Sequence, residues 1–317
     1  MIWAIGLAAM SLAHAEEWPS KPLHMIVAYP PGGGLDFVTR TVAQRLAERL
    51  KQQVIVDNRS GASGSIGTDA VAKSPADGYT LLMASPAEIV VGPAAGQKTP
   101  YKLETDLVPV LLVGETPLVF AVHPSVDAKD LAALVALAKA APNKFSYGTP
   151  GTGSSMNFAG EAFKASTGAS IQHVPYRGAA PALNDVLGNQ VPMVIVGMPP
   201  VVPHAKSGKL RVLVVTTAKR SSLMPEVPAV AELPGLKDYR FSNWMMVLAP
   251  AKTPPETIER LRRELAAIVA EPQTRERLLG AGVEPMGLGG AELTAFLTDE
   301  RKRYDRVAKD NNIRFSD

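Results

Sequence analysis

The sequence of 317 residues predicts an α/β fold built from two domains. Short apolar runs alternate with amphipathic helical stretches along nearly the whole chain, which is typical of βα units with parallel strands. The chain is longer than one typical hydrophobic core requires, so we expect two α/β domains, a double-crossover hinge and an interdomain cleft. We predict a leader at residues 1–15, a first domain at 16–119 with 246–317, and a second domain at 120–245.

The first fifteen residues are predicted to be a signal peptide. Residues 2–12 are almost wholly apolar but too short to span a bilayer, and Ala13-His14-Ala15 has the small-x-small pattern of a cleavage site. The stretch lacks Lys and Arg near Met1, and a buried N-terminal segment is the alternative. We expect export with cleavage after Ala15. The chain has no cysteine, which excludes a lipid anchor on an N-terminal cysteine and thiolate metal ligands.

Apolar spacing predicts the elements of the first domain. Residues 36–50 carry apolar side chains at every fourth position, so this stretch is predicted to be a helix with one buried face. These side chains are Val38, Val42, Leu46 and Leu50. Apolar runs bounded by turn residues predict strands at 23–29, 54–57 and 80–84, and a helix at 65–72. The runs 108–113 and 118–122 are predicted to be two strands that cross between the domains.

A second series of βα units is predicted after the crossing strands. Its strands are expected at residues 145–147, 171–174, 193–196 and 210–215, and its helices at 131–137, 155–165 and 180–187. Residues 219–238 are rich in proline and predicted to be irregular. A strand at 244–248 returns toward the first domain. A long helix after Pro254-Pro255 and helices at 273–279 and 291–308 complete the chain.

Two glycine-rich loops each follow a predicted strand and precede a predicted helix. Residues 30–36 read Pro-Pro-Gly-Gly-Gly-Leu-Asp, and residues 148–155 read Gly-Thr-Pro-Gly-Thr-Gly-Ser-Ser. Glycines leave backbone N–H groups uncovered and a helix N-terminus adds partial positive charge, so each loop can bind an anionic oxygen without a cationic side chain. Two such loops that face each other would clamp a small acid. The alternative is structural turns, with Asp36, Ser154 or Ser155 as helix caps.

Other motifs offer little support for catalysis. Nothing resembles a dinucleotide fingerprint, a P-loop, a hydrolase elbow or a metal-ligand cluster, so we expect no cofactor and no metal. An exported esterase or isomerase acting on a carboxylated substrate is the alternative function, with His173 and either Ser154 or Ser155 as its base and nucleophile. Lys and Arg number 33 against 30 Asp and Glu without a long basic run, so no nucleic-acid partner is expected.

Several motifs, in the same order along the chain, resemble the Bug family, the extracytoplasmic solute-binding proteins of tripartite tricarboxylate transporters. The motifs are at residues 30–36, 56–62, 77–82, 147–154, 173–178, 208–211, 225–232 and 244–250. The resemblance covers essentially the whole chain after the leader. It implies a type II periplasmic-binding-protein fold, in which two α/β domains close on a small carboxylate.

The resemblance also implies partners and site residues. A periplasmic monomer without a lipid anchor would capture a small organic acid, partly through ordered waters, and deliver it to the membrane permease subunits of the transporter; it would not be an enzyme. The candidate ligand-binding residues are Pro31, Gly32, Gly33, Gly34, Asp36, Ser85, Ala87, Thr149, Gly151, Thr152, Gly153, Ser154, Ser155, Tyr176, Gly178 and Ala179.

Two positions depart from the family pattern. Pro192 and Gly197 stand where the family often carries acidic residues. Their neutrality predicts a pocket that disfavours ligands with an amino group and is more neutral or apolar. A binding protein used for signalling would share the same site, so the residues leave transport and signalling both open.

Overall fold

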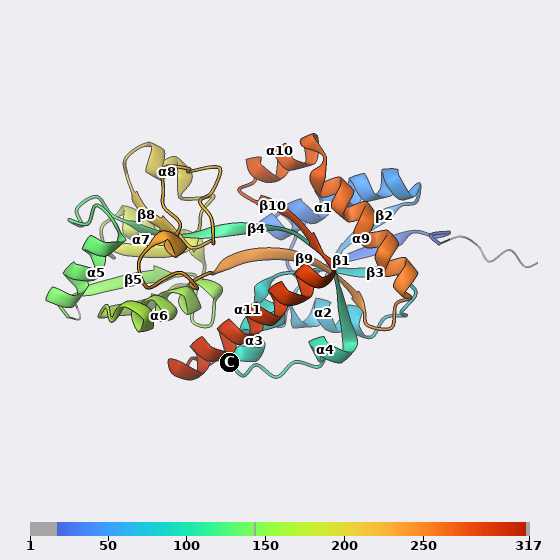
Figure 1. Ribbon diagram of the computed structural model, residues 1–317, viewed down its shortest axis with the longest axis horizontal. Helices are drawn as coiled ribbons and strands as arrows, with labels where there is room; N and C mark the ends of the chain where they lie inside the picture. The colour runs from blue at the N-terminus through green and yellow to red at the C-terminus, as the bar shows by residue number, and fades with distance from the viewer. Residues whose placement is uncertain (1–17, 143, 315–317) are drawn as a thin grey trace, which may run out of the picture.

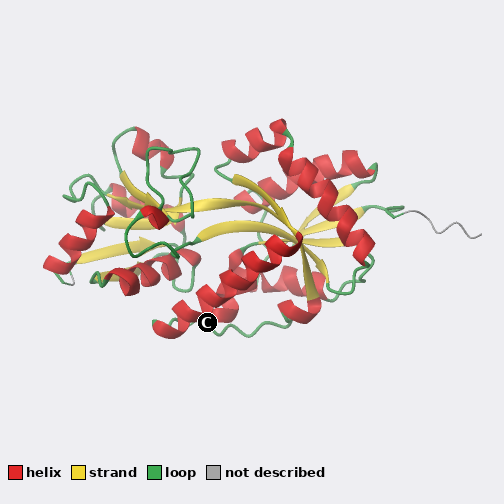
Figure 2. Ribbon diagram, viewed as in Figure 1, coloured by secondary structure: helices red, strands yellow, loops and turns green. Residues whose placement is uncertain are grey.

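The structure is a computed structural model that describes residues 18–142 and 144–314 and shows two lobes joined by long strands (Figure 1). The predicted signal peptide lies outside the described residues. Strands β4 (Leu107–Val122) and β9 (Ser242–Pro250) run from one lobe to the other. Helices cover the strands on both sides in each lobe (Figure 2). The mixed α/β class predicted from the alternating pattern is therefore confirmed.

The first lobe has strand order β2-β1-β3-β9-β4, with β10 beside β4. Strands β1 to β3 are parallel, and β9 and β10 are antiparallel to their neighbours. The new strands are β1 (Leu23–Val27), β2 (Val54–Asn58), β3 (Thr80–Ala84) and β10 (Glu284–Gly289). The helices are α1 (Gly34–Leu50), α2 (Ser65–Ala72), α9 (Pro255–Ala270), α10 (Pro272–Gly280) and α11 (Gly290–Asp310). Helix α1 buries the four side chains predicted from their spacing.

The second lobe is built around the end of β4. Residues 118–122 of β4 pair with β7 on one side and β8 on the other, and β7 continues to β5 and β6. The strands are β5 (Phe145–Thr149), β6 (Ile171–Pro175), β7 (Met193–Gly197) and β8 (Arg211–Val215). The helices are α5 (Leu131–Ala140), α6 (Ser155–Thr167), α7 (Ala179–Leu187) and α8 (Val202–Lys206).

The prediction of two separate strands at residues 108–113 and 118–122 is wrong, because β4 is one strand of 16 residues. Residues 114–117, which neither predicted strand included, lie inside β4. At Pro117 the strand changes partners: this residue is opposite Ser242 of β9, and Leu118 is opposite Gly197 of β7. A proline without an N–H is tolerated where a ladder changes.

Short elements between the predicted ones were missed. They are η1 (Ala62–Gly64), η2 (Ala87–Val91), α3 (Gly92–Ala94), α4 (Leu103–Asp106) and η3 (Val230–Glu232), besides α8 and β10. Single turns and strands that pair over a few residues leave no periodic signal. Across residues 18–142 and 144–314, no helix combines the length and the apolar character that a membrane crossing needs.

Helix α11 connects the two lobes on one side of the hinge strands (Figure 1). It packs against β4 and β10 of the first lobe and against α6 of the second. Its Tyr304 ring contacts Phe158 and Phe241, with ring centroids at 5.2 and 5.5 Å. Its buried Glu300 accepts a hydrogen bond of 2.9 Å from Trp244 Nε1 on β9. The apolar core is therefore continuous behind the hinge.

Candidate functional site

The N-terminus of α1 opens onto a cleft and has no side-chain cap. Gly33 is the N-cap of the helix, and no side chain bonds to its first N–H groups. The Phe37 N–H donates to the Gly33 carbonyl oxygen at 3.0 Å, so the N–H groups of Gly34 and Leu35 have no helical acceptor. Gly33, Gly34 and Leu35 line the cleft. Their N–H groups can donate to a bound anion, aided by the helix dipole.

Asp36 lies behind this loop and holds its shape. The prediction that it caps the helix is wrong, because α1 begins at Gly34 and Asp36 lies in the first turn. Its buried carboxylate accepts hydrogen bonds of 3.0 Å each from the Gly32 N–H, Arg40 Nε and Asn58 Nδ2. Burial raises the pKa of Asp36, but the hydrogen bonds from Arg40, Gly32 and Asn58 outweigh it and lower the pKa to about 2. Asp36 is therefore a charged anchor for the glycine loop.

Helix α6 presents a second N-terminus to the same cleft. Ser154 is its N-cap, the structural role named for it above, and its hydroxyl oxygen accepts a hydrogen bond of 3.2 Å from the Asn157 N–H. The Phe158 N–H donates to the Ser154 carbonyl oxygen at 3.0 Å, so the N–H groups of Ser155 and Met156 have no helical acceptor. Ser154, Ser155 and Met156 all line the cleft.

The cleft has a volume of about 890 Å³ and joins these two helix ends. None of the described residues that line it is charged. Its walls are mainly apolar, formed by Leu35, Met156, Trp244, Met245 and Val283. Positive potential in the cleft therefore comes from backbone N–H groups at two helix N-termini, and Ser154, Ser155 and Ser85 add hydroxyl groups. An arrangement of this kind suits one carboxylate attached to an organic body.

The structure brings half of the predicted site residues to the cleft. These are Pro31, Gly32, Gly33, Gly34, Ser85, Ala87, Ser154 and Ser155. The other predicted residues are not part of its lining: Asp36, Thr149, Gly151, Thr152, Gly153, Tyr176, Gly178 and Ala179. The second group includes residues that support the α6 loop, since the Tyr176 N–H donates to the Thr149 carbonyl oxygen at 2.9 Å. That the second group contacts ligand stays a prediction.

His173 is part of that support. Its Nε2 lies 2.7 Å from Thr149 Oγ1, and its Nδ1 lies 3.3 Å from Asn157 Nδ2. Burial lowers the pKa of His173. The Ser154 hydroxyl instead donates to the Gly151 carbonyl oxygen at 2.7 Å. Among the described residues, the base and nucleophile that the enzyme alternative requires are therefore not hydrogen-bonded to each other.

Two residues of the hinge strands line the cleft but are absent from the predicted site residues. Thr116 of β4 and Asn243 of β9 are opposite each other in the strand register. Two adjacent polar residues, Glu115 and Thr116, inside a strand that is mainly apolar are the signal that would have identified Thr116. Because both residues lie on the strands that join the lobes, a ligand that contacts them touches the hinge itself.

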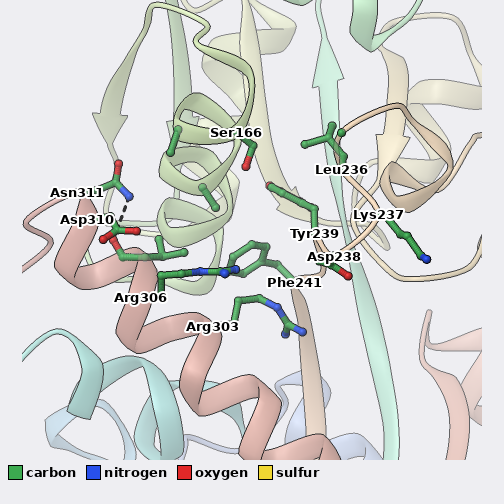
Figure 3. A pocket seen from close by; sticks show the side chains of 14 residues that line it. Ser166, Leu236, Lys237, Asp238, Tyr239, Phe241, Arg303, Arg306, Asp310 and Asn311 are labelled. Carbon is green, nitrogen blue, oxygen red and sulfur yellow. Dashed lines mark hydrogen bonds between the residues drawn. The ribbon is translucent and has the colours of Figure 1, made fainter.

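A second cavity, of about 570 Å³, lies between α6, α11 and residues 235–241 (Figure 3). Its lining mixes charges of both signs, including Lys237, Asp238 and Arg306. The Tyr239 hydroxyl, at its side, already donates to the Ala159 carbonyl oxygen at 2.5 Å. Neither of the two glycine loops reaches this cavity, so the candidate site is the larger cleft.

Comparison with known proteins identifies the family. The model of the tripartite tricarboxylate transporter family receptor, TctC, matches residues 38–313. The protein BugT of Bordetella pertussis is 39% identical over 310 residues, which cover 98% of this chain and 94% of BugT. A UPF0065 protein of Bordetella bronchiseptica is 37% identical over 317 residues, which cover 99% of this chain and 93% of that protein.

Solved structures agree with these relatives. A TctC solute binding protein from Polaromonas has a TM-score of 0.82 at 28% identity, over 92% of this chain and 99% of the other. An R. palustris protein solved with adipate has a TM-score of 0.78 at 33% identity, over 94% of this chain and 99% of that protein. The fold is thus that of periplasmic binding proteins of the TctC and Bug type. The chain belongs to the tripartite tricarboxylate transporter receptor family, a family of solute-binding receptors.

Proposed function

We propose that this receptor captures a small organic acid in the cleft between its lobes and delivers it to the membrane permease of a tripartite tricarboxylate-type transporter. The observation that carries the proposal is the convergence of two helix N-termini, those of α1 and α6, on one cleft without charged side chains. Each N–H donated to a carboxylate contributes about 1.5–3 kcal/mol. Four such bonds, less the cost of immobilising the ligand, correspond to binding on the order of micromolar.

Closure of the lobes is the proposed mechanism of capture. The first lobe contributes the α1 end and the second contributes the α6 end, so one carboxylate held by both favours the closed arrangement. Thr116 and Asn243 lie in the cleft on the strands that join the lobes, where bending is expected. We also propose that the chain is exported to the periplasm with cleavage after Ala15. The two domains that close are the predicted ones, residues 16–119 with 246–317 and residues 120–245. The adipate bound to the R. palustris relative supports the ligand class.

A thermal-shift screen tests the proposed function. Ligand-free protein is mixed with a panel of organic acids and with the primary amide of each acid. Binding to the folded state stabilises it by about 2.7 kcal/mol at a hundredfold excess over Kd, so at least one acid should raise the melting temperature. The matching amide should not, because it lacks the anionic oxygens. Protein that responds to none of the acids, or equally to acid and amide, contradicts the proposal.

A further inference from the structure

Glu88 is a buried carboxyl group beside the cleft that the carboxylate clamp does not use. It lies in η2, which two residues separate from the end of β3, and none of its surface is exposed. Its side chain packs on Gly64, where an added Cβ would lie 3.0 Å from Glu88 Cβ. A buried carboxyl group is costly unless hydrogen bonds satisfy its oxygens. Its hydrogen-bond partners therefore indicate what it does.

Glu88 receives its hydrogen bonds from two residues that line the cleft. Glu88 Oε1 accepts from the Ser85 N–H at 2.6 Å. Glu88 Oε2 accepts from the Ser85 hydroxyl at 2.7 Å and from the Tyr29 hydroxyl at 2.8 Å. Burial raises the pKa of Glu88, and the hydrogen bonds from Ser85 and Tyr29 oppose that rise. Three donors around one group are the environment that a carboxylate requires.

These bonds fix where two hydroxyl hydrogens point. Ser85 and Tyr29 are both part of the cleft lining, whereas Glu88 is completely buried. Each hydroxyl has a single hydrogen and two acceptors within reach. The Ser85 hydroxyl lies 2.7 Å from Glu88 Oε2 and 3.2 Å from the Tyr29 oxygen, and the Tyr29 hydroxyl lies 2.8 Å from Glu88 Oε2 and 3.4 Å from the Ser63 carbonyl oxygen, so the shorter bond of each is the one to Glu88. The oxygens of Ser85 and Tyr29 therefore have only lone pairs left for the cleft. This part of the wall accepts hydrogen bonds, while the two helix N-termini donate them.

We infer that Glu88 makes the Ser85 and Tyr29 side of the cleft an acceptor site, which selects acids whose second polar group is a hydroxyl over acids with a second carboxylate. The inference rests on the proposed function, because the helix N-termini must hold the first carboxylate. A ligand hydroxyl donates to Ser85 or Tyr29. A second carboxylate has no hydrogen to donate to either oxygen and places its own lone pairs against theirs, which is unfavourable for both reasons.

Paired titrations test this inference. The purified protein is titrated calorimetrically with ω-hydroxy acids and with dicarboxylates of the same chain length, from malonate to adipate. The wild type should bind the best hydroxy acid about 10-fold or more tightly than its matching dicarboxylate. Glu88→Gln should erase this preference, because an amide group can donate to Ser85 and Tyr29 and turn a hydroxyl hydrogen toward the cleft. Glu48→Gln, on the exposed side of α1, is the matched control and should keep the wild-type ratio.

Each outcome decides between the two proposals. If the wild type binds dicarboxylates as tightly as hydroxy acids, or if Glu88→Gln leaves the ratio unchanged, the inference is overturned and the proposed function stands. If no acid binds, both fall. Should Glu88→Gln fail to fold, Ser85→Ala removes an acceptor while Glu88 remains. This variant should lower the hydroxy-acid preference about 10-fold, and an unchanged ratio overturns the inference.

Discussion

Gly34→Asp should abolish binding of organic acids while the protein stays folded. Gly34 is the first residue of α1 and lines the cleft, and nothing lies within 4 Å of a Cβ placed there. A carboxylate at this position competes for the free N–H groups and repels the ligand carboxylate. Placing two like charges together costs several kcal/mol, so affinity should fall at least ~100-fold in calorimetric titration.

The same substitution should not destabilise the chain. An acidic residue in the first turn of a helix is favourable by about 0.3–1 kcal/mol, and replacing glycine within a helix adds about as much. Gly34→Ala introduces the same Cβ without the charge and should retain most of the affinity. If Gly34→Ala loses as much affinity as Gly34→Asp, shape and not charge is responsible. If Gly34→Asp binds normally, the α1 N-terminus is not part of the ligand site.

Asp36→Ala should cost about 3 kcal/mol of stability, because it leaves the Gly32 N–H and the Asn58 amide without their acceptor. The substitution should also weaken acid binding, since Asp36 fixes the loop that carries the donors. Urea unfolding at neutral pH measures the first effect and calorimetric titration the second. Glu48→Ala, which removes an exposed carboxylate of the same helix, should stay close to the wild type in both.

The pH dependence of stability separates the charge of Asp36 from its shape. Its pKa is lowered from 3.8 to about 2 in the folded state, so its contribution is complete above about pH 4. The contribution is lost as the pH falls from about 4 to about 2, because the unfolded chain takes up the proton first. Wild-type stability should drop through this interval, and Asp36→Asn should drop less. If the stability of the wild type and that of Asp36→Asn fall in parallel over this interval, the Asp36 charge does not support the loop.

Local patterns were enough to predict most of the fold. The spacing of Val38, Val42 and Leu46 predicted the buried face of α1, and the glycine loops were predicted at helix starts. Such features depend on residues within one turn or strand, so the sequence carries them directly. The length of β4 was not predictable in this way, because a strand that changes partners at Pro117 is decided by β7 and β9.

The candidate site was predicted only in part, because some of its features are local in the sequence and others depend on tertiary packing. Backbone donors in the two loops follow from glycine, proline and the position of the helix starts. Ala281 and Val283 reach the cleft from the segment after α10, and only tertiary packing places them there. Asp36 illustrates a further difficulty, since the family resemblance placed it among the ligand-binding residues and its position suggested a helix cap. Its bonds to Arg40 and Asn58 are formed behind the loop and could not be inferred from spacing.

The crystal structure of the complex with the acid that binds most tightly is the most direct test of the central claim. We predict one carboxylate between the two helix N-termini, within hydrogen-bond distance of the N–H groups of Gly34 or Leu35 and of Ser155 or Met156. The two lobes should be closer together than in the ligand-free protein. A carboxylate held by Arg or Lys side chains elsewhere, or by only one of the two helix ends, would contradict the account.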